Sequence, residues 1–204
     1  MKVPLADHLY QIYPSIPRYA NDPEESDVIR AYDFLVRRFE GFYGKQPQYF
    51  AKAGATPLLM GDQHDYIGYP YVAFSSSQNI IVAVASTTSG KIRINNYQSA
   101  MYGEQVFESC LSKWHFEEKE GENGQFFNVF MKLMMQVAEE ASLTDLGGLD
   151  LLIYSSFVEE EFMGWREALY STFYSAVSTA ITHAKIIEEK QIVRALQQAA
   201  AIDP

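Results

Sequence analysis

The chain has 204 residues, of which 48% are hydrophobic and 21% are charged, and its formal net charge at pH 7 is −10. This length and composition are typical of one globular domain with a buried core, and they exclude the disordered and collagen-like classes. A chain this acidic is not expected to bind nucleic acid, because binding to phosphates depends on lysine and arginine side chains.

The N-terminal residues 1–26 are predicted to form an irregular arm. This segment holds four of the eight prolines of the chain and shows little periodicity. It also carries three tyrosines, Tyr10, Tyr13 and Tyr19, which suit packing against a partner or against the rest of the chain. Residues 27–204 are predicted to form the single folded domain, because they contain no internal repeat and no low-complexity linker.

The first element of this domain is predicted to be a helix that starts at Asp27. Apolar positions recur there every three or four residues as far as Phe39, which is the spacing of one helix face. Ser26 is the expected N-cap, since its hydroxyl can accept a hydrogen bond from the first turn. Gly41 or Gly44 is the expected end of the helix.

Five short strands are predicted to follow this helix. Their apolar and alternating patterns place them at residues 48–52, 58–60, 71–74, 79–86 and 91–97. The last two strands are joined by a turn around Ser89 and Gly90, and lysine, isoleucine and arginine alternate after it. This pattern is a β-hairpin signal. We therefore predict that segments 79–86 and 91–97 pair with each other.

The second half of the chain is predicted to hold three helices and one strand. Residues 125–141 are apolar on most of the circumference of a helix, which indicates burial on more than one side. A nearly continuous apolar strand is predicted at residues 149–154, and helices at 165–189 and 191–201. The sum of these elements is an α+β fold.

Neither a membrane span nor a secretory signal is predicted. No stretch reaches about 18 consecutive apolar residues, and the first 17 residues are interrupted by prolines, Asp7 and His8. The single cysteine, Cys110, cannot form a disulfide within the chain, and the four histidines show no metal-binding spacing. We therefore expect no metal site and an intracellular location, the cytoplasm first and an organelle as the alternative.

The order of elements and several short motifs resemble the N-terminal part of a galactokinase, within the GHMP small-molecule kinases. The run GDQHDY at residues 61–66 stands where that family has GEHxDY, and Asn128 in FFNV stands for the Asn of its WxNY motif. GLDLLIYSS and ALQQAAA match the strand before the family's phosphate loop and a Gln-rich helix after it. The resemblance covers residues 27–201 and implies a GHMP-kinase N-terminal-domain-like mixed sheet with helices packed on one face.

The resemblance implies a sugar-binding turn. Matched position by position, the residues that hold sugar hydroxyls in galactokinases correspond here to Asp62, Gln63, Asp65 and Tyr66. This chemistry is reasonable, because carboxylates accept hydrogen bonds from hydroxyls and an aromatic ring can cover an apolar sugar face. The alternative is a solvated turn in which the two aspartates only bend and cap the backbone.

The parts of the family that handle phosphate are altered in this chain. Thr56 stands where the family has a catalytic arginine, so no catalytic residue is predicted. The degenerate phosphate loop consists of Glu160, Glu161, Phe162, Gly164, Trp165 and Arg166. A glutamate about 4 Å from a phosphate charge is repulsive by roughly 4 kcal/mol at an effective dielectric constant near 20. We therefore expect binding of ATP and Mg²⁺ to be lost, and no cofactor.

The sequence thus predicts a non-catalytic galactokinase-like domain that serves as a structural or interaction subunit of a larger assembly. The alternatives are a sugar sensor, and one lobe of an ATP-dependent sugar kinase that another segment completes. We expect a partner chain or a second copy to cover apolar faces of the helices at 125–141 and 165–189, with Trp165 in the interface. Replacing Trp165 with aspartate would then weaken the complex more than it unfolds the subunit.

Overall fold

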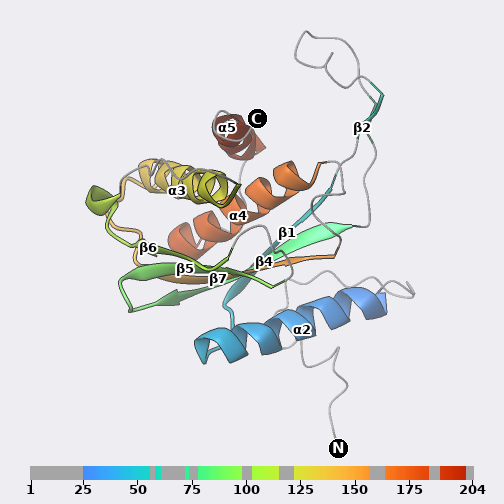
Figure 1. The fold of residues 1–204 in the computed structure, drawn as a ribbon, viewed down its shortest axis with the longest axis horizontal. Coiled ribbons are helices and arrows are strands. Elements are labelled where there is room, and N and C mark those ends of the chain that lie inside the picture. Colours follow the sequence, from blue (N-terminus) through green and yellow to red (C-terminus); the bar gives the residue numbers. More distant parts are fainter. Residues whose placement is uncertain are drawn as a thin grey trace, which may run out of the picture.

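The structure is a computed structural model that describes residues 25–55, 58–60, 72–73, 78–97, 103–114, 122–156, 164–183 and 189–200. Its helices are α2 (Glu25–Tyr43), α3 (Glu122–Glu140), α4 (Trp165–Thr182) and α5 (Glu189–Ala200), with one 3-10 turn, η2 (Leu111–Lys113). Its strands are β1 (Tyr49–Gly54), β2 (Leu58–Met60), β3 (Val72–Ala73), β4 (Asn79–Thr87), β5 (Lys91–Asn96), β6 (Gln105–Glu108) and β7 (Gly148–Ser155). The fold is α+β, as predicted (Figure 1).

Five strands form one mixed sheet in the order β1-β4-β7-β5-β6. β4 pairs antiparallel with both β1 and β7, and β6 pairs antiparallel with β5, whereas β5 and β7 are parallel. β2 and β3 form a separate two-stranded ribbon that stands away from this sheet (Figure 1). Among the described helices, none is long and apolar enough to cross a membrane.

The predicted hairpin between the segments of β4 and β5 is wrong. Both strands form where predicted, but β7 lies between them and pairs with each. The start of β7 passes close to the turn that joins β4 to β5. A Cβ atom on Gly148 would lie 2.6 Å from the carbonyl oxygen of Thr87 and 3.2 Å from the nitrogen of Gly90. A glycine at the start of β7 therefore lets this strand enter the gap between the two arms.

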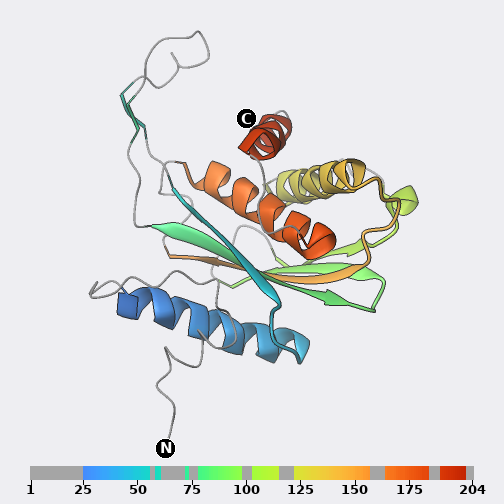
Figure 2. The same ribbon diagram turned by 180° about the vertical axis from the view of Figure 1, so that it is seen from behind.

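Both faces of the sheet are covered by helices. α3, α4 and α5 lie on one face, as expected, but α2 covers the opposite face, so the expectation that the helices pack on one face is corrected (Figure 2). The strand residues show why. In β4, Ile80, Val82 and Val84 face one cluster, and Ile81 and Ala83 face the other. A strand that is apolar on both sides requires cover on both faces of its sheet.

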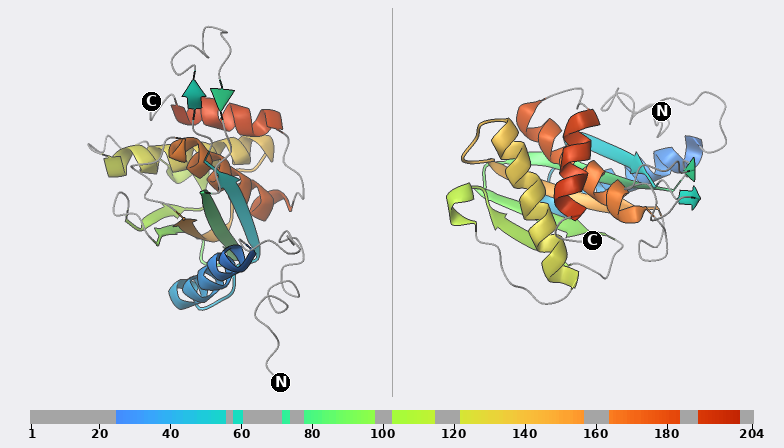
Figure 3. Two further views of the ribbon diagram at one scale, coloured as in Figure 1. Left: turned by 90° about the vertical axis from the view of Figure 1, so that its right-hand side faces the viewer. Right: turned by 90° about the horizontal axis from the view of Figure 1, so that it is seen from above.

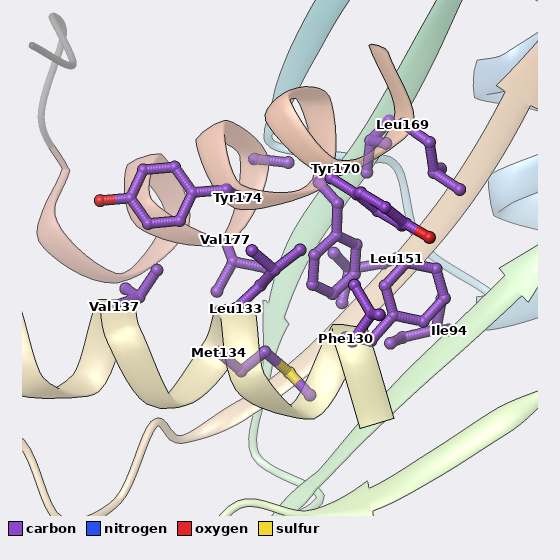
Figure 4. Close-up of a cluster of buried hydrophobic side chains, with 14 of the residues drawn as sticks. Ile94, Phe130, Leu133, Met134, Val137, Leu151, Leu169, Tyr170, Tyr174 and Val177 are labelled. Carbon is purple, nitrogen blue, oxygen red and sulfur yellow. The ribbon is translucent and has the colours of Figure 1, made fainter. Parts of the chain in front are cut away.

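The larger core lies between the sheet and helices α3 and α4. Phe130 of α3 stacks on Phe173 of α4 with ring centroids 4.4 Å apart, and both side chains are fully buried. Figure 4 shows residues of α3, such as Leu133 and Val137, directed toward α4, where Val177 meets them. The two helices thus cover each other as well as the sheet.

The ends of the helices follow local backbone chemistry. α2 begins at Glu25, so Ser26 lies inside the helix and is not its N-cap. Gly44 ends this helix as predicted, because its φ of 70° is left-handed and its N–H bonds to the carbonyl of Glu40 at 2.8 Å. α4 ends at Thr182, seven residues before the predicted Glu189, where His183 adopts a left-handed φ of 53°.

Two elements, β6 and η2, were not predicted. β6 is four residues long, and its buried and exposed positions alternate at the edge of the sheet. A four-residue alternation carries little signal on its own, because several loop sequences of a chain this size show it by chance. Pairing with β5 makes it a strand.

Candidate functional site

One edge of the sheet gathers the C-terminal ends of several strands. The pairing directions place the C-terminal ends of β1, β5 and β7 at the same edge. α4 runs back from this edge, because His183 at its far end lies 3.1 Å from the hydroxyl of Tyr49, at the start of β1. Ligands of α/β proteins often bind at such strand ends.

Ser156 joins β7 to β4 at this edge. Its hydroxyl accepts a hydrogen bond from the backbone N–H of Asn79 at 2.8 Å, and lies 3.1 Å from the side-chain oxygen of Gln78. Its backbone N–H also bonds to the carbonyl of Asn79 at 3.0 Å. These bonds fix the point at which the chain leaves β7 toward α4.

Most of the predicted site residues lie outside the described residues. These are Thr56, Asp62, Gln63, Asp65, Tyr66, Glu160, Glu161 and Phe162. The sugar-binding turn therefore stays a prediction, as does the acidic part of the degenerate phosphate loop. The flanking elements are described, since β2 ends at Met60, β7 ends at Ser155 and α4 begins at Trp165.

The described part of the degenerate phosphate loop is the start of α4. Gly164 is the N-cap, with a left-handed φ of 82° and without a side chain that could cap the first turn. Trp165 is only 8% exposed, and its ring lies 5.7 Å from that of Phe126 in α3. The guanidinium of Arg166 lies 5.6 Å from the centre of the Trp165 ring. A large aromatic core residue therefore stands where the resemblance places a small serine.

The reason given for an interface at these helices is not supported. We expected Trp165 and the apolar faces of helices α3 and α4 to need a partner, but they are buried within the chain. The large hydrophobic side chains that are exposed among the described residues are Phe42, Val106, Leu143 and Val193. They lie on different elements and do not extend the faces that were expected to be uncovered.

A buried charge cluster lies on the α2 side of the sheet, and the sequence analysis missed it. Asp150 of β7 is fully buried and accepts a hydrogen bond from Arg93 Nε at 2.7 Å. The ammonium of Lys45 lies 2.8 Å from its other oxygen as an ion pair, outside hydrogen-bond geometry, and donates to the carbonyl of Ser86 at 2.8 Å. The signal was present, because Asp150 interrupts an otherwise apolar strand.

Tyr43 closes this cluster at the end of α2. Its hydroxyl donates to the carbonyl of Leu151 at 2.7 Å and accepts from the amide of Asn95 at 3.1 Å. Burial raises the pKa of Tyr43 well above its ordinary value. Arg93 lies over the Tyr43 ring at 4.9 Å, and the hydrogen bond to Asp150 raises the pKa of Arg93. The cluster thus fastens α2 to β7 and β5, away from the candidate site.

The described residues form no group of three or more histidine, cysteine, aspartate or glutamate side chains that could hold a metal ion. The start of α4 has no side-chain cap, and the guanidinium of Arg166 lies over the Trp165 ring there. In the sequence, three consecutive glutamates, Glu159 to Glu161, precede this helix.

Comparison with known proteins finds galactokinases and related kinases. The galactokinase of Candida maltosa is 25% identical over 118 residues, which are 57% of this chain and 54% of that protein. The chain therefore spans about half the length of the curated relative that it matches. No family model matches the chain.

Solved structures of small-molecule kinases share the fold. The galactokinase of Lactococcus lactis, solved with galactose, matches with a TM-score of 0.63 at 15% identity, over 83% of this chain and 42% of that one. The mevalonate kinase of Methanococcus jannaschii matches with a TM-score of 0.61 at 12% identity, over 76% and 46%. The chain is thus galactokinase-like and has the fold of the N-terminal domain of GHMP kinases.

Proposed function

We propose that this chain is a non-catalytic galactokinase-like domain that has lost phosphoryl transfer and acts as a binding or scaffolding module. The observation that carries the proposal is the first turn of α4, where Trp165 is buried against Phe126. Phosphate loops work because small residues let backbone N–H groups close around an anion. Here an indole ring stands where the family has a small residue, and its removal would cost core packing.

Charge supports the same proposal. Glu160 and Glu161 stand at the glycines of the family's loop, and Thr56 stands at its arginine. Two added negative charges and one lost positive charge all act against a triphosphate. Arg93 and Lys45 offer no replacement cation, because both are engaged by Asp150 on the α2 side of the sheet.

Mg-ATP at millimolar concentration is therefore expected to leave the Tm of the protein unchanged. A ligand that binds only the folded state must raise the Tm, so the measurement is a thermal melt with and without Mg-ATP. A shift of several degrees would contradict the proposal. A variant with glycine at positions 160, 161 and 162 is the matched comparison. A shift in that variant alone would assign the loss to these three side chains.

A sugar sensor is the second candidate, and it depends on the GDQHDY turn. If galactose or a related sugar binds, Asp65→Asn is expected to weaken binding by roughly 1 to 3 kcal/mol, because a charge-assisted hydrogen bond to a hydroxyl is lost. Isothermal titration of the wild type and the variant measures this. Asp145→Asn, a substitution of an exposed aspartate in the turn before β7, is a suitable control. Equal titrations, or no heat from the wild type, would leave the turn without a sugar-binding role.

The third candidate is one lobe of a sugar kinase that another segment completes. The length comparison favours it, because the chain covers 42% of the Lactococcus lactis galactokinase. The size and composition of the native complex, purified through a tag on this chain, distinguish it from the non-catalytic module. A complex that phosphorylates galactose with ATP would establish the kinase. A partner without that activity would support the scaffold.

A further inference from the structure

We propose that α5 is a detachable helix, which undocks from α3 and α4 as one unit while the sheet and the larger core stay folded. This inference concerns the outer layer of the molecule and does not depend on whether phosphoryl transfer is lost. Figure 3 shows α5 on the outer side of α3 and α4, farthest from the sheet. Among the described elements, α5 packs mainly against these two helices and makes no main contact with the sheet.

The apolar contacts of α5 are small. Its fully buried side chains are Ala195 and Ala199, and Ile192 and Leu196 are only partly buried. α4 is different, because it buries large side chains such as Phe173 and Tyr174. Free energy from apolar burial scales with the area removed from water, so two alanines and two half-covered aliphatic chains hold a helix weakly. Undocking would add little exposed area at Val193, because this residue is already 45% exposed in the docked state.

Gln191 at the start of α5 makes two hydrogen bonds to α3. Its side-chain amide donates to Glu140 Oε2 at 2.9 Å, and its carbonyl accepts from Gln136 at 3.4 Å. Glu140 keeps its other donors without α5, because Tyr174 of α4 and Gln136 of α3 also bond to it. Losing α5 therefore removes one hydrogen bond from this carboxylate and leaves it otherwise satisfied.

The docked state carries a cost at Gln136. This residue is 1% exposed, and its side-chain oxygen has no hydrogen-bond partner within the part of the chain that the structure describes. A buried acceptor without a donor loses its hydration without compensation. Departure of α5 would give water access to this oxygen, which lowers the cost of undocking. Weak apolar packing and this unsatisfied oxygen both favour opening below the level of global unfolding.

Native-state hydrogen exchange in low concentrations of urea tests the proposal. We expect the amides of residues 193–199 to share one opening constant, at least about a hundredfold larger than that of β7, with a weaker urea dependence than global unfolding. Protection in α5 equal to that of β7 would overturn the proposal. A gradient of protection that falls steadily toward Ala200 would also overturn it, because it would show fraying of the end and not release of a unit.

A substitution of Gln191 tests whether its hydrogen bond to Glu140 holds α5 in place. Gln191→Ala is expected to raise the opening constant of α5 about tenfold and leave β7 unchanged, since alanine removes the bond to Glu140 and favours helix. Glu139→Gln is the matched control. Glu139 is the neighbour of Glu140 and reaches Arg194 of α5 only at 3.7 Å between exposed side chains, so less than a twofold change is expected. Equal effects of the two variants would overturn the role of Gln191.

A second variant tests whether the remainder folds alone. Ala195→Asp places a carboxylate in the contact between α5 and its neighbours, and should leave α5 unprotected while β4 and β7 keep their protection. Loss of protection in β4 and β7 together with α5 would show that the helix is an integral part of the core and would overturn the proposal.

Discussion

Replacement of Asp150 by alanine is expected to lower the free energy of unfolding by about 3 kcal/mol, the lower end of the range for breaking a buried ion pair. Asp150 is fully buried, and both Arg93 and Lys45 lie within 2.8 Å of its carboxylate. Without it, two cations are left facing each other beside a cavity. Their side chains are 35% and 31% exposed, so both can turn toward water, and this moderates the loss.

Urea denaturation measures this effect, and two further variants interpret it. Asp33→Ala removes a partly buried carboxylate from an i, i+4 pair in α2 whose partner, Arg37, is exposed, and should cost less than about 1 kcal/mol. A triple variant with Leu at 150 and Met at 45 and 93 removes the whole cluster, and should be far less destabilised than Asp150→Ala. If the free energy of unfolding of Asp150→Ala lay within about 1 kcal/mol of the wild-type value, the result would contradict the structural role of the cluster.

Trp165→Asp is expected to unfold the domain, which reverses the expectation drawn from the sequence. The side chain is 8% exposed and packs on Phe126, so aspartate would bury a charge and leave a large cavity. Removal of a buried tryptophan side chain alone costs about 3 to 5 kcal/mol, and an unpaired buried charge adds to that. The total is a large share of the roughly 5 to 15 kcal/mol that stabilises a typical domain.

Far-UV circular dichroism and a urea titration of the purified chain, without any partner, check the second prediction. Trp165→Phe is the matched control, because it keeps a ring against Phe126 and should cost much less than Trp165→Ala. If Trp165→Asp retained the stability of the wild type, the indole would not be part of the core. Loss of a native complex by a variant that stays folded would restore the interface expected from the sequence.

The two predictions concern opposite faces of the five-stranded sheet. β7 sends Leu149, Leu151 and Ile153 toward α3 and α4, and Asp150 and Leu152 toward α2. The first set forms the core that extends to Trp165, and the second set contacts the helix that ends at Tyr43. Neighbouring substitutions in β7 therefore act on opposite layers of the domain.

The sequence by itself determined the elements whose signal lies within one segment. The three- and four-residue spacing from Val28 to Phe39 predicted α2, and the glycines after it limited its end to Gly41 or Gly44, because only local backbone geometry is involved. Runs of apolar and alternating residues fixed β1, β4, β5 and β7 within two residues at each end. The order of these elements, with GDQHDY and the shorter matches FFNV and GLDLLIYSS, also carried the resemblance to galactokinase, which the comparisons support.

Only the tertiary structure decided which segments meet. The turn at Gly90 signals a hairpin, but β7 enters between its arms, because a strand that is apolar on both sides is most stable at the centre of a covered sheet. That placement brings Asp150 beside Arg93, its partner in the parallel register. It also lets α3 and α4 cover each other, so that Trp165 lies in a core and not on a surface. Such contacts join residues far apart in the chain, and periodicity within a segment carries no information about them.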